Sequence, residues 1–542
     1  MTLYACKSCG YVVGGDENKH HRETSDITKS LSRTNNPPSA IELGLLREEY
    51  KDLARVSASL EAQIVRLRTS VAALEKEQGQ INALLLKHRS VLNPCRRLPG
   101  EILADIFDLC VREDLNMMER MRKLSQHHDS SSTLDIDKCP WVLGQVCRGW
   151  RDLVLSLPRL WSSIDINWPQ GSEKLNMSLV ERRLTLALQR SRDKELHVSW
   201  HESSCPAKIV PLLCLSSFRW VNATIRASAE GFGLLAPYSG LFSSLSTLHL
   251  HFKDDRLLDE DGNDSVFRDT PTLRHLTLSG HVSPISRLRT NLPWSQLLKF
   301  TLRSANPLTE RVCVGLHKVL PLLRGLRTLE IQTSFEFVRE GIHTIALTHL
   351  RTLTLASPVA PRSVANLLDS VTLPSLRVLA IAGPDMLHIN LQSLLTRSSA
   401  QLDELSIAMV NDQTLTKILE IPQVQTVQAL SIGGPPGDVG YFGVSDNVLN
   451  ALKLNIPEIT NAAVLPCLQH ITLLGRRRWT DKALVEMLAS RRNVSQRNAA
   501  FNPIVSVALN HAKFGLEGVD IQMKNLLDGG LTARDSRGRF VL

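Results

Sequence analysis

Apolar residues between positions 43 and 88 recur in two series, each with a period of seven residues. The first series is Leu46, Leu53, Leu60, Leu67, Leu74, Ile81 and His88, and the second is Leu43, Tyr50, Ser57, Ile64, Val71, Gln78 and Leu85. Eleven of these fourteen positions are apolar, and charged residues such as Arg47, Glu61 and Glu75 flank them. This repeat predicts a coiled-coil helix over 41–92, which could self-associate through residues 43–88. A long helix that folds back on its own chain fits the same pattern.

A second pattern, L-x-x-L-x-L, occurs ten times from residue 245 onward. The copies span 245–250, 273–278, 297–302, 326–331, 350–355, 376–381, 402–407, 427–432, 449–454 and 468–473. This is the signature of leucine-rich repeats, in which each copy forms a short parallel strand and the intervals form helices. We therefore expect an α/β fold with an irregular leucine-rich-repeat solenoid, or horseshoe, over 190–490 and a C-terminal extension over 491–542.

In each copy, the residue between the last two apolar positions is expected to face solvent on the concave side of the solenoid. These residues are His249, Thr277, Thr301, Glu330, Thr354, Ala380, Ser406, Ser431, Lys453 and Thr472. Most are small or hydroxylic, whereas a nucleic-acid groove needs stacked basic and aromatic side chains, and aromatic residues are only 5% of the chain. The concave side is therefore predicted to hold a protein substrate, and nucleic acid is not expected.

Two apolar stretches lie between the heptads and the repeats. The first, RRLPGEILADIFDLC over 96–110, starts a helix at Pro99 and places Ile102, Leu103, Ile106 and Phe107 along one side. The second is CPWVLGQVCRGWRDLVLSLPRLW over 139–161. Residues 112–140 are polar and have no repeating apolar face, which predicts an inserted loop.

Together the two stretches resemble an F-box, whose pattern is Leu-Pro, Glu-Ile-Leu and Ile-Phe, followed by Val-Cys-x-x-Trp. The chain is similar in particular to F-box-like proteins of mushroom-forming fungi, which place a Cys-x2-Cys start, an N-x-P-P linker and a heptad helix before the F-box and irregular leucine-rich repeats after it. The resemblance implies an F-box over 94–165 that docks on a Skp-type adaptor of a cullin-RING ubiquitin ligase. The residues that it implies for this contact are Leu98, Pro99, Ile102, Leu103, Ile106, Phe107, Val146, Cys147 and Trp150.

The resemblance further implies that the repeats bind the substrate and that this receptor carries no catalytic residue. The sequence agrees with a non-enzymatic protein, because we find no phosphate-binding loop, dinucleotide-binding turn, nucleophile elbow or zinc-protease motif. A coiled-coil and leucine-rich-repeat scaffold without a ligase role is the alternative. A zinc-containing nucleic-acid binder is a third hypothesis.

The N-terminal segment, residues 1–40, is polar and is predicted to be flexible. Within it, Cys6 and Cys9 have the Cys-x2-Cys spacing of half a zinc site, which His20 and His21 could complete. Two free thiols, or a site completed by a second chain, are the alternatives.

Composition changes this picture little. The net charge of +9 comes from 63 basic against 54 acidic residues, a mild imbalance on 542 residues. No apolar run reaches the ~18 residues that a membrane span needs, and the first residues lack the pattern of a secretory signal. Ten irregularly spaced cysteines are typical of reduced thiols, so we expect a cytoplasmic or nuclear protein. Basic clusters at 475–478 and 490–497 are predicted to be solvated surface.

Overall fold

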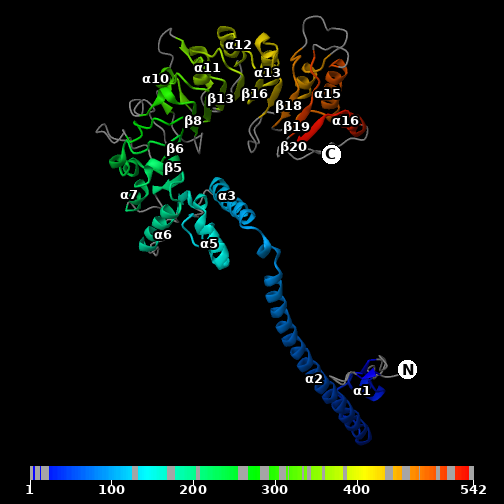
Figure 1. Cartoon of the computed structure of the whole chain (residues 1–542). Coiled ribbons are helices and arrows are strands. Elements are labelled where there is room, and N and C mark those ends of the chain that lie inside the picture. The colour runs from blue at the N-terminus through cyan, green and yellow to red at the C-terminus, as the bar shows by residue number, and fades with distance from the viewer. Residues whose placement is uncertain are drawn as a thin grey trace. The chain divides into compact units, whose positions relative to one another are not determined.

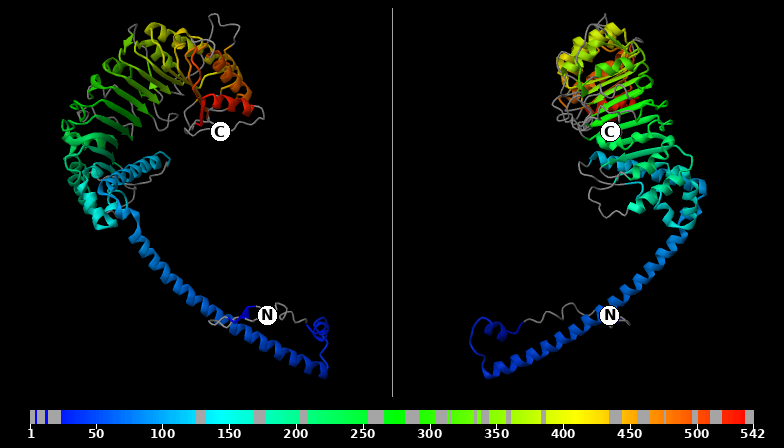
Figure 2. Two further views of the ribbon diagram at one scale, coloured as in Figure 1. Left: turned by 45° about the vertical axis from the view of Figure 1, so that its right-hand side comes forward. Right: turned by 90° about the vertical axis from the view of Figure 1, so that its left-hand side faces the viewer.

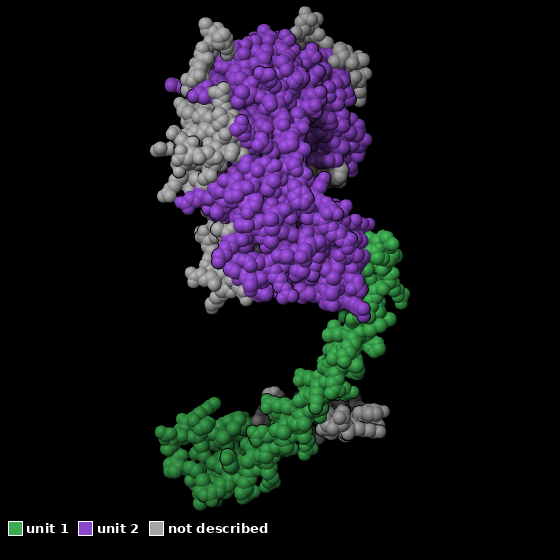
Figure 3. All heavy atoms as spheres, turned by 60° about the vertical axis from the view of Figure 1, so that its left-hand side comes forward, with its two compact units in different colours: residues 1–103 green, residues 104–542 purple. Residues whose placement is uncertain are grey.

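The computed structural model describes residues 4–5, 12–13, 24–124, 132–167, 177–202, 208–253, 266–280, 292–303, 313–314, 316–332, 335–337, 344–356, 361–382, 387–433, 444–454, 464–474, 477–495, 501–509 and 519–535. It divides into two compact units, residues 1–103 and 104–542, which Figure 3 colours separately. The division falls inside one helix, α3 (Gly100–Leu124), and therefore inside the stretch predicted as the F-box.

The first unit consists mainly of one long helix, α2 (Ala40–Leu92), which confirms the helix predicted over 41–92. A capping box starts it, in which the Ser39 hydroxyl accepts from the N–H of Glu42 and the Glu42 carboxylate accepts from the N–H of Ser39. It ends at Asn93, because Pro94 disfavours a helical residue before it, and a short helix η2 (Pro94–Arg97) follows. No residue of α2 is buried, so within the described residues this helix does not fold back on its own chain.

Short elements precede α2. Strands β1 (Tyr4–Ala5) and β2 (Val12–Val13) pair antiparallel, and α1 (Asp26–Leu31) follows them. Ser25 caps α1, and its hydroxyl also donates to the carboxylate of Glu49 in α2 at 2.8 Å. A short helix thus lies within the segment 1–40 that the sequence predicts to be flexible.

The second unit begins with a group of short helices that we call the helical module. It comprises α3 from Ala104 onward, α4 (Leu143–Val146), α5 (Arg148–Ser156) and η3 (Pro158–Trp161). Because α3 continues to Leu124, the loop predicted over 112–140 is wrong for 112–124. The helix continues because Val111 and Met118 extend the buried stripe of Ala104 and Phe107 at helical spacing.

One sheet of fourteen parallel strands runs through the rest of the second unit, and its strand order follows the chain (Figure 1). The strands are β3 (Ser163–Ile166), β4 (Leu196–His201), β5 (Trp220–Ala227), β6 (Thr247–Phe252), β7 (His275–Gly280), β8 (Lys299–Arg303), β10 (Thr328–Gln332), β13 (Thr352–Ala356), β15 (Val378–Ala382), β16 (Glu404–Ala408), β17 (Ala429–Ile432), β18 (His470–Leu473), β19 (Ser506–Leu509) and β20 (Thr532–Asp535). Two small parallel pairs accompany it, β9 (Cys313–Val314) with β11 (Phe335–Glu336) and β12 (Ile345–Ala346) with β14 (Val371–Thr372). The predicted α/β class with a parallel sheet is confirmed.

Buried and more exposed side chains alternate along most of these strands, which explains why these segments form a sheet with one covered face. In β6, Leu248 and Leu250 are buried while His249 between them is exposed, and β7 repeats the pattern with Leu276 and Leu278. The sheet curves, and helices cover its outer side (Figure 2). The helices are α6 (Met177–Arg190), α7 (Ile209–Cys214), α8 (Ala229–Gly233), α10 (Leu316–Val319), α11 (Pro361–Ser370), α12 (Leu387–Ser398), α13 (Asp412–Leu419), α14 (Asp446–Ala451), α15 (Asp481–Ser495) and α16 (Val519–Asp528), with short turns η5 (Ser217–Arg219), η6 (Ala236–Tyr238), η8 (Trp294–Gln296), η9 (Leu320–Leu322) and η10 (Pro422–Val424).

The sheet is longer than the sequence predicted. Its first strand lies at 163–166, ahead of the expected start at 190, and the supposed extension after 490 supplies β19, α16 and β20. Nine of the ten L-x-x-L-x-L copies end in a strand of the sheet, but 449–454 does not, because α14 occupies its first half and β17 pairs directly with β18. None of the described helices combines the length and hydrophobicity needed to cross a membrane.

Candidate protein-binding surfaces

An aromatic pair holds the helical module together. Phe107 of α3 is fully buried, and its ring centroid lies 4.8 Å from that of Trp150 in α5, with the two planes at 60°. Cys147 starts α5, since its sulfur accepts from the N–H of Trp150 at 3.4 Å. Arg159 of η3 links the end of the module to α3, because its guanidinium donates to the carbonyl of Ala104 at 3.2 Å. Three of the residues implied by the resemblance, Phe107, Cys147 and Trp150, are therefore brought together.

A second group of apolar residues in the module is exposed. Ile106 and Leu109 of α3 are 37% and 62% exposed, and Val146 at the end of α4 is 59% exposed. Val142 and Leu155 are also exposed. Helix α3 thus carries two apolar stripes, one buried inside the module and one open to solvent. Leu109 belongs to the open stripe and was missed by sequence reasoning, although its spacing from Ile106 was the available signal.

The other four predicted contact residues belong to the first unit. Pro99 and Ile102 are exposed there, and Leu98 and Leu103 are half-buried. The carbonyl of Pro99 accepts from the N–H of Leu103 at 3.1 Å, so Pro99 opens the first turn of α3 as expected.

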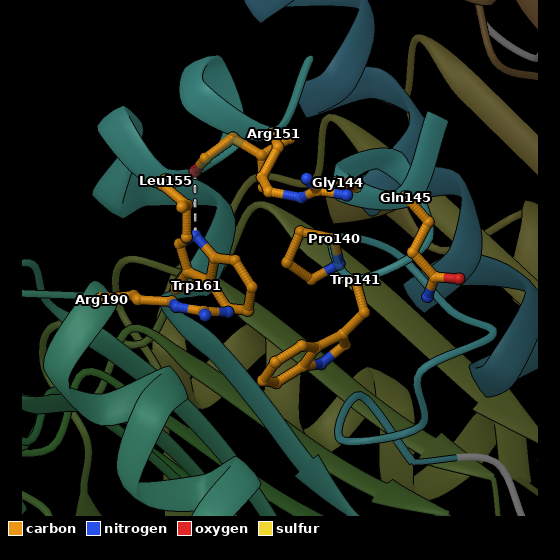
Figure 4. A pocket seen from close by; sticks show the side chains of 9 residues that line it. Pro140, Trp141, Gly144, Gln145, Arg151, Leu155, Trp161 and Arg190 are labelled. Atoms are coloured by element: carbon orange, nitrogen blue, oxygen red, sulfur yellow. Dashed lines mark hydrogen bonds between the residues drawn. The ribbon is translucent and has the colours of Figure 1, made fainter. Parts of the chain in front are cut away.

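A pocket of about 200 Å³ lies between the helical module and the end of α6. Figure 4 shows Trp141 and Trp161 in it, with ring centroids 4.8 Å apart in an edge-on arrangement. The guanidinium of Arg190, the last residue of α6, lies 4.4 Å from the Trp161 ring and 5.0 Å from the Trp141 ring, and burial lowers its pKa. The indole N–H of Trp161 donates to the carbonyl of Val154 at 3.0 Å. Arg190 therefore ties the module to α6, the helix that connects β3 and β4, a contact that no sequence pattern indicated.

The predicted substrate-facing residues form one continuous row across the sheet. Strand register aligns His249, Thr277, Thr301, Glu330, Thr354, Ala380, Ser406, Ser431 and Thr472 in that order. The row lies on the face opposite the buried leucines. Apart from His249, which is exposed, and Thr301, these side chains are half-buried between their neighbours.

Thr301 does not face solvent as predicted, because it is only 1% exposed. Its hydroxyl donates to the carboxylate of Glu330 at 3.4 Å, and the same carboxylate pairs with Lys299 at 2.6 Å and with Arg303 at 3.7 Å. These longer side chains cover the threonine between them.

Lys453 is also placed wrongly by the sequence prediction. It follows α14 instead of lying in a strand, and its ammonium pairs with the Glu486 carboxylate of α15 at 2.6 Å. The hydrogen bond from Lys453 lowers the pKa of Glu486. Lys453 therefore belongs to the helical side of the sheet and is removed from the substrate-facing set.

The amino-terminal part of the row is basic. Lys299 and Arg303 flank Thr301 in β8. The pKa of His249 is lowered, first because surrounding protein atoms remove part of the water around its ring although the side chain stays exposed, and further by Arg303 and Lys299, whereas Glu119 of α3 raises it. From β13 to β17 the row carries only Thr354, Ala380, Ser406 and Ser431. The two halves of this face thus differ in charge.

The lowered pKa of His249 predicts how stability depends on pH. Below the ordinary histidine pKa of 6.5, the unfolded chain takes up a proton that the folded chain resists, so the free energy of unfolding falls as the pH decreases through this range. Replacing His249 with glutamine should reduce that fall. Urea unfolding of both proteins at pH 7 and pH 5 measures it, and an unchanged pH dependence in the variant would contradict the prediction.

The predicted metal ligands Cys6 and Cys9 lie outside the described residues, as do His20 and His21. Among the residues that the structure describes, no group of three or more histidine, cysteine or acidic side chains is arranged to hold a metal ion.

No protein-family model matches the chain, and no curated protein matches it either. The fold therefore defines the protein only at the level of class, as a mixed α/β protein with a long parallel sheet and two solvent-facing surfaces, one apolar and one polar.

Proposed function

We propose that this chain is the substrate-recognition subunit of a Skp-cullin-F-box ubiquitin ligase. In this proposal the helical module and the start of α3 are the F-box, and the curved sheet is a leucine-rich-repeat horseshoe that binds a protein substrate. The chain has no catalytic role of its own, and it acts in the cytoplasm or nucleus by holding the substrate near the ubiquitin carrier, which raises the effective concentration of the reacting groups.

The exposed apolar residues of the helical module, Ile106 and Leu109 of α3 and Val146 at the end of α4, are the observation that carries the proposal. Exposed apolar residues that gather in one small module mark interaction sites, because leaving them in water is unfavourable. Each such side chain contributes roughly 1.5–3 kcal/mol when fully buried, so several together offset a good part of the cost of association. The buried Phe107 packs on the half-buried Trp150, and this contact joins α3 to α5 beneath the exposed residues.

The polar row on the sheet supports the substrate half of the proposal. It presents hydroxyl and small side chains over many strands, which suits an extended peptide or a protein surface. Because Arg190 joins the helical module to α6, the helix that connects β3 and β4, a substrate on the sheet would be held at a fixed place relative to the adaptor.

A scaffold without a ligase role is the second candidate. The exposed apolar heptad residues of α2 fit it, because they can bind other chains without any adaptor. The two candidates differ in one measurement. Blocking cullin activity should raise the amount of a bound substrate if the chain is a ligase receptor, and should leave it unchanged if the chain is a scaffold.

Affinity purification with mass spectrometry tests the proposed adaptor contact. We expect wild-type protein to retain a Skp-type adaptor and a cullin, and Ile106→Asp or Val146→Asp to reduce both at least about tenfold, because a charge replaces a buried apolar contact. Leu215→Asp is the matched control: it makes the same kind of change at a leucine that is 70% exposed after α7 and outside the module. Retention of the adaptor by both module variants would show that this surface is not the adaptor site.

A further inference from the structure

Helix α2 carries an apolar seam, formed by its two heptad series, and no other apolar element among the described residues covers it. The seam residues Leu53, Leu60, Ile64, Val71 and Leu74 are all exposed, and no residue of this 53-residue helix is buried. Helices in proteins owe most of their stability to packing of an apolar face, and local propensity alone leaves even well-capped helices marginal. A persistent helix of this length therefore requires a partner along the seam.

We propose that α2 pairs with α2 of a second copy of this chain in a parallel, in-register, two-stranded coiled coil. In heptad positions, the series of Leu46 occupies d and the series of Leu43 occupies a. Leucine fills d from Leu46 to Leu74, and β-branched residues fill the central a positions, Ile64 and Val71. This distribution favours two parallel strands over higher oligomers.

Two polar seam residues decide the orientation. In a parallel in-register pair, each a residue meets its own counterpart, so Gln78 faces Gln78 and Ser57 faces Ser57, and each pair can satisfy its hydrogen bonds. In a full-length antiparallel pair, each a residue meets a d residue of the other chain. Gln78 would then face Leu53 and Ser57 would face Leu74, which leaves polar groups buried without partners.

The charges beside the seam are compatible with this pairing. In a parallel coil each g residue approaches the e residue five positions later in the other chain, which brings Glu42 to Arg47. The other six pairings are 49 with 54, 56 with 61, 63 with 68, 70 with 75, 77 with 82 and 84 with 89, and none of them joins two like charges. No repulsion therefore opposes a second copy as the occupant.

Pairing through α2 would make the protein bivalent. Two copies of the polar row would act on one substrate or assembly, and the second contact would then form at an elevated effective concentration. The pairing does not rest on the proposed ligase role, since neither the adaptor nor a substrate takes part in it. Its tests use the purified full chain alone.

The mass of the full chain in solution tests the association. Sedimentation equilibrium should give twice the monomer mass for the wild type and for Ala62→Asp/Val65→Asp, which alters the outer side of α2. Leu60→Asp/Ile64→Asp, which alters the seam, should weaken association by at least about a hundredfold. All four positions are exposed in a single chain, so a monomeric protein would show no difference between the two variants. A wild-type protein of monomer mass, or equal behaviour of the variants, would overturn the proposal.

Oxidative cross-linking tests the orientation. Leu45 and Leu46 are adjacent, but only Leu46 lies in the seam, so Leu46→Cys should form a covalent dimer beyond any background from the native cysteines and Leu45→Cys should not. A disulfide needs Cα atoms about 4.4–6.8 Å apart, a condition that symmetric d positions approach only in the parallel pair. Cross-linking of Leu46→Cys to Leu85→Cys in a mixture, without cross-linking of Leu46→Cys to itself, would instead show an antiparallel pair and overturn the proposed orientation.

Discussion

Replacing Phe107 with alanine is expected to lower the free energy of unfolding of the helical module by about 3–5 kcal/mol. Phe107 has no exposed surface, and its ring packs against Trp150 at 4.8 Å, so the substitution removes a large buried side chain and the aromatic contact together. Urea unfolding, combined with hydrogen exchange of α3 and α5, measures the loss.

Leu109→Ala is the matched control, because Leu109 lies on the same helix but is largely exposed. It should change the stability by no more than about 0.5 kcal/mol. If the two substitutions cost the same, the division of α3 into a buried and an exposed stripe is wrong. The same division explains why a loss of adaptor on Phe107→Ala would be ambiguous, whereas Ile106→Asp and Val146→Asp leave the aromatic pair in place.

Arg491→Met is expected to destabilise the sheet by about 3 kcal/mol or more, because buried acceptors without a donor each cost about 1–3 kcal/mol. Arg491 of α15 is only 1% exposed. Its guanidinium donates to the carbonyls of Leu452, Leu465 and Val464 at 2.7, 2.9 and 2.6 Å. Burial lowers its pKa to about 10, so it remains charged at neutral pH.

Thermal unfolding at pH 7 measures this effect. Lys482→Met on the same helix is the control, since Lys482 is exposed and its ammonium lies 3.9 Å from the Glu486 carboxylate, a surface pair of small value. We expect the control to unfold within a degree or two of wild type. Equal melting temperatures for both variants would show that the three carbonyls do not depend on Arg491.

The burial of Arg491 also shows that one prediction from the sequence is wrong. The basic cluster at 490–497 was predicted to be solvated, and the sequence offered no reason to separate Arg491 from Arg492. Arginine is seldom buried, so a solvated surface is the reasonable interpretation of such a run. What places Arg491 inside are the carbonyls of Leu452, Val464 and Leu465, which lie beside α15 and need a donor. That requirement is set by a distant segment and leaves no local pattern.

The prediction that Lys453 faces the substrate is wrong for a related reason. The copy at 449–454 satisfies the L-x-x-L-x-L pattern, but Val448, Leu449 and Leu452 also have helical spacing, and Ser445 caps a helix by accepting from the N–H of Asn447. Both structures fit the local sequence. The sheet decides between them, because β17 pairs directly with β18 and no place for a strand remains between the two.

Sequence periodicity by itself determined the elements whose signal is local. The seven-residue repeat fixed α2, and nine L-x-x-L-x-L copies fixed the strands and the register of one polar row, because apolar spacing alone specifies which side of a helix or strand must be covered. Tertiary structure alone decided what covers each side. In the folded chain Phe107 is buried while Ile106, next to it on the same helix, is exposed, and Glu330 covers Thr301. Residues beyond 490 form strands of the sheet. None of this follows from local sequence, because burial depends on neighbours that are distant in the chain.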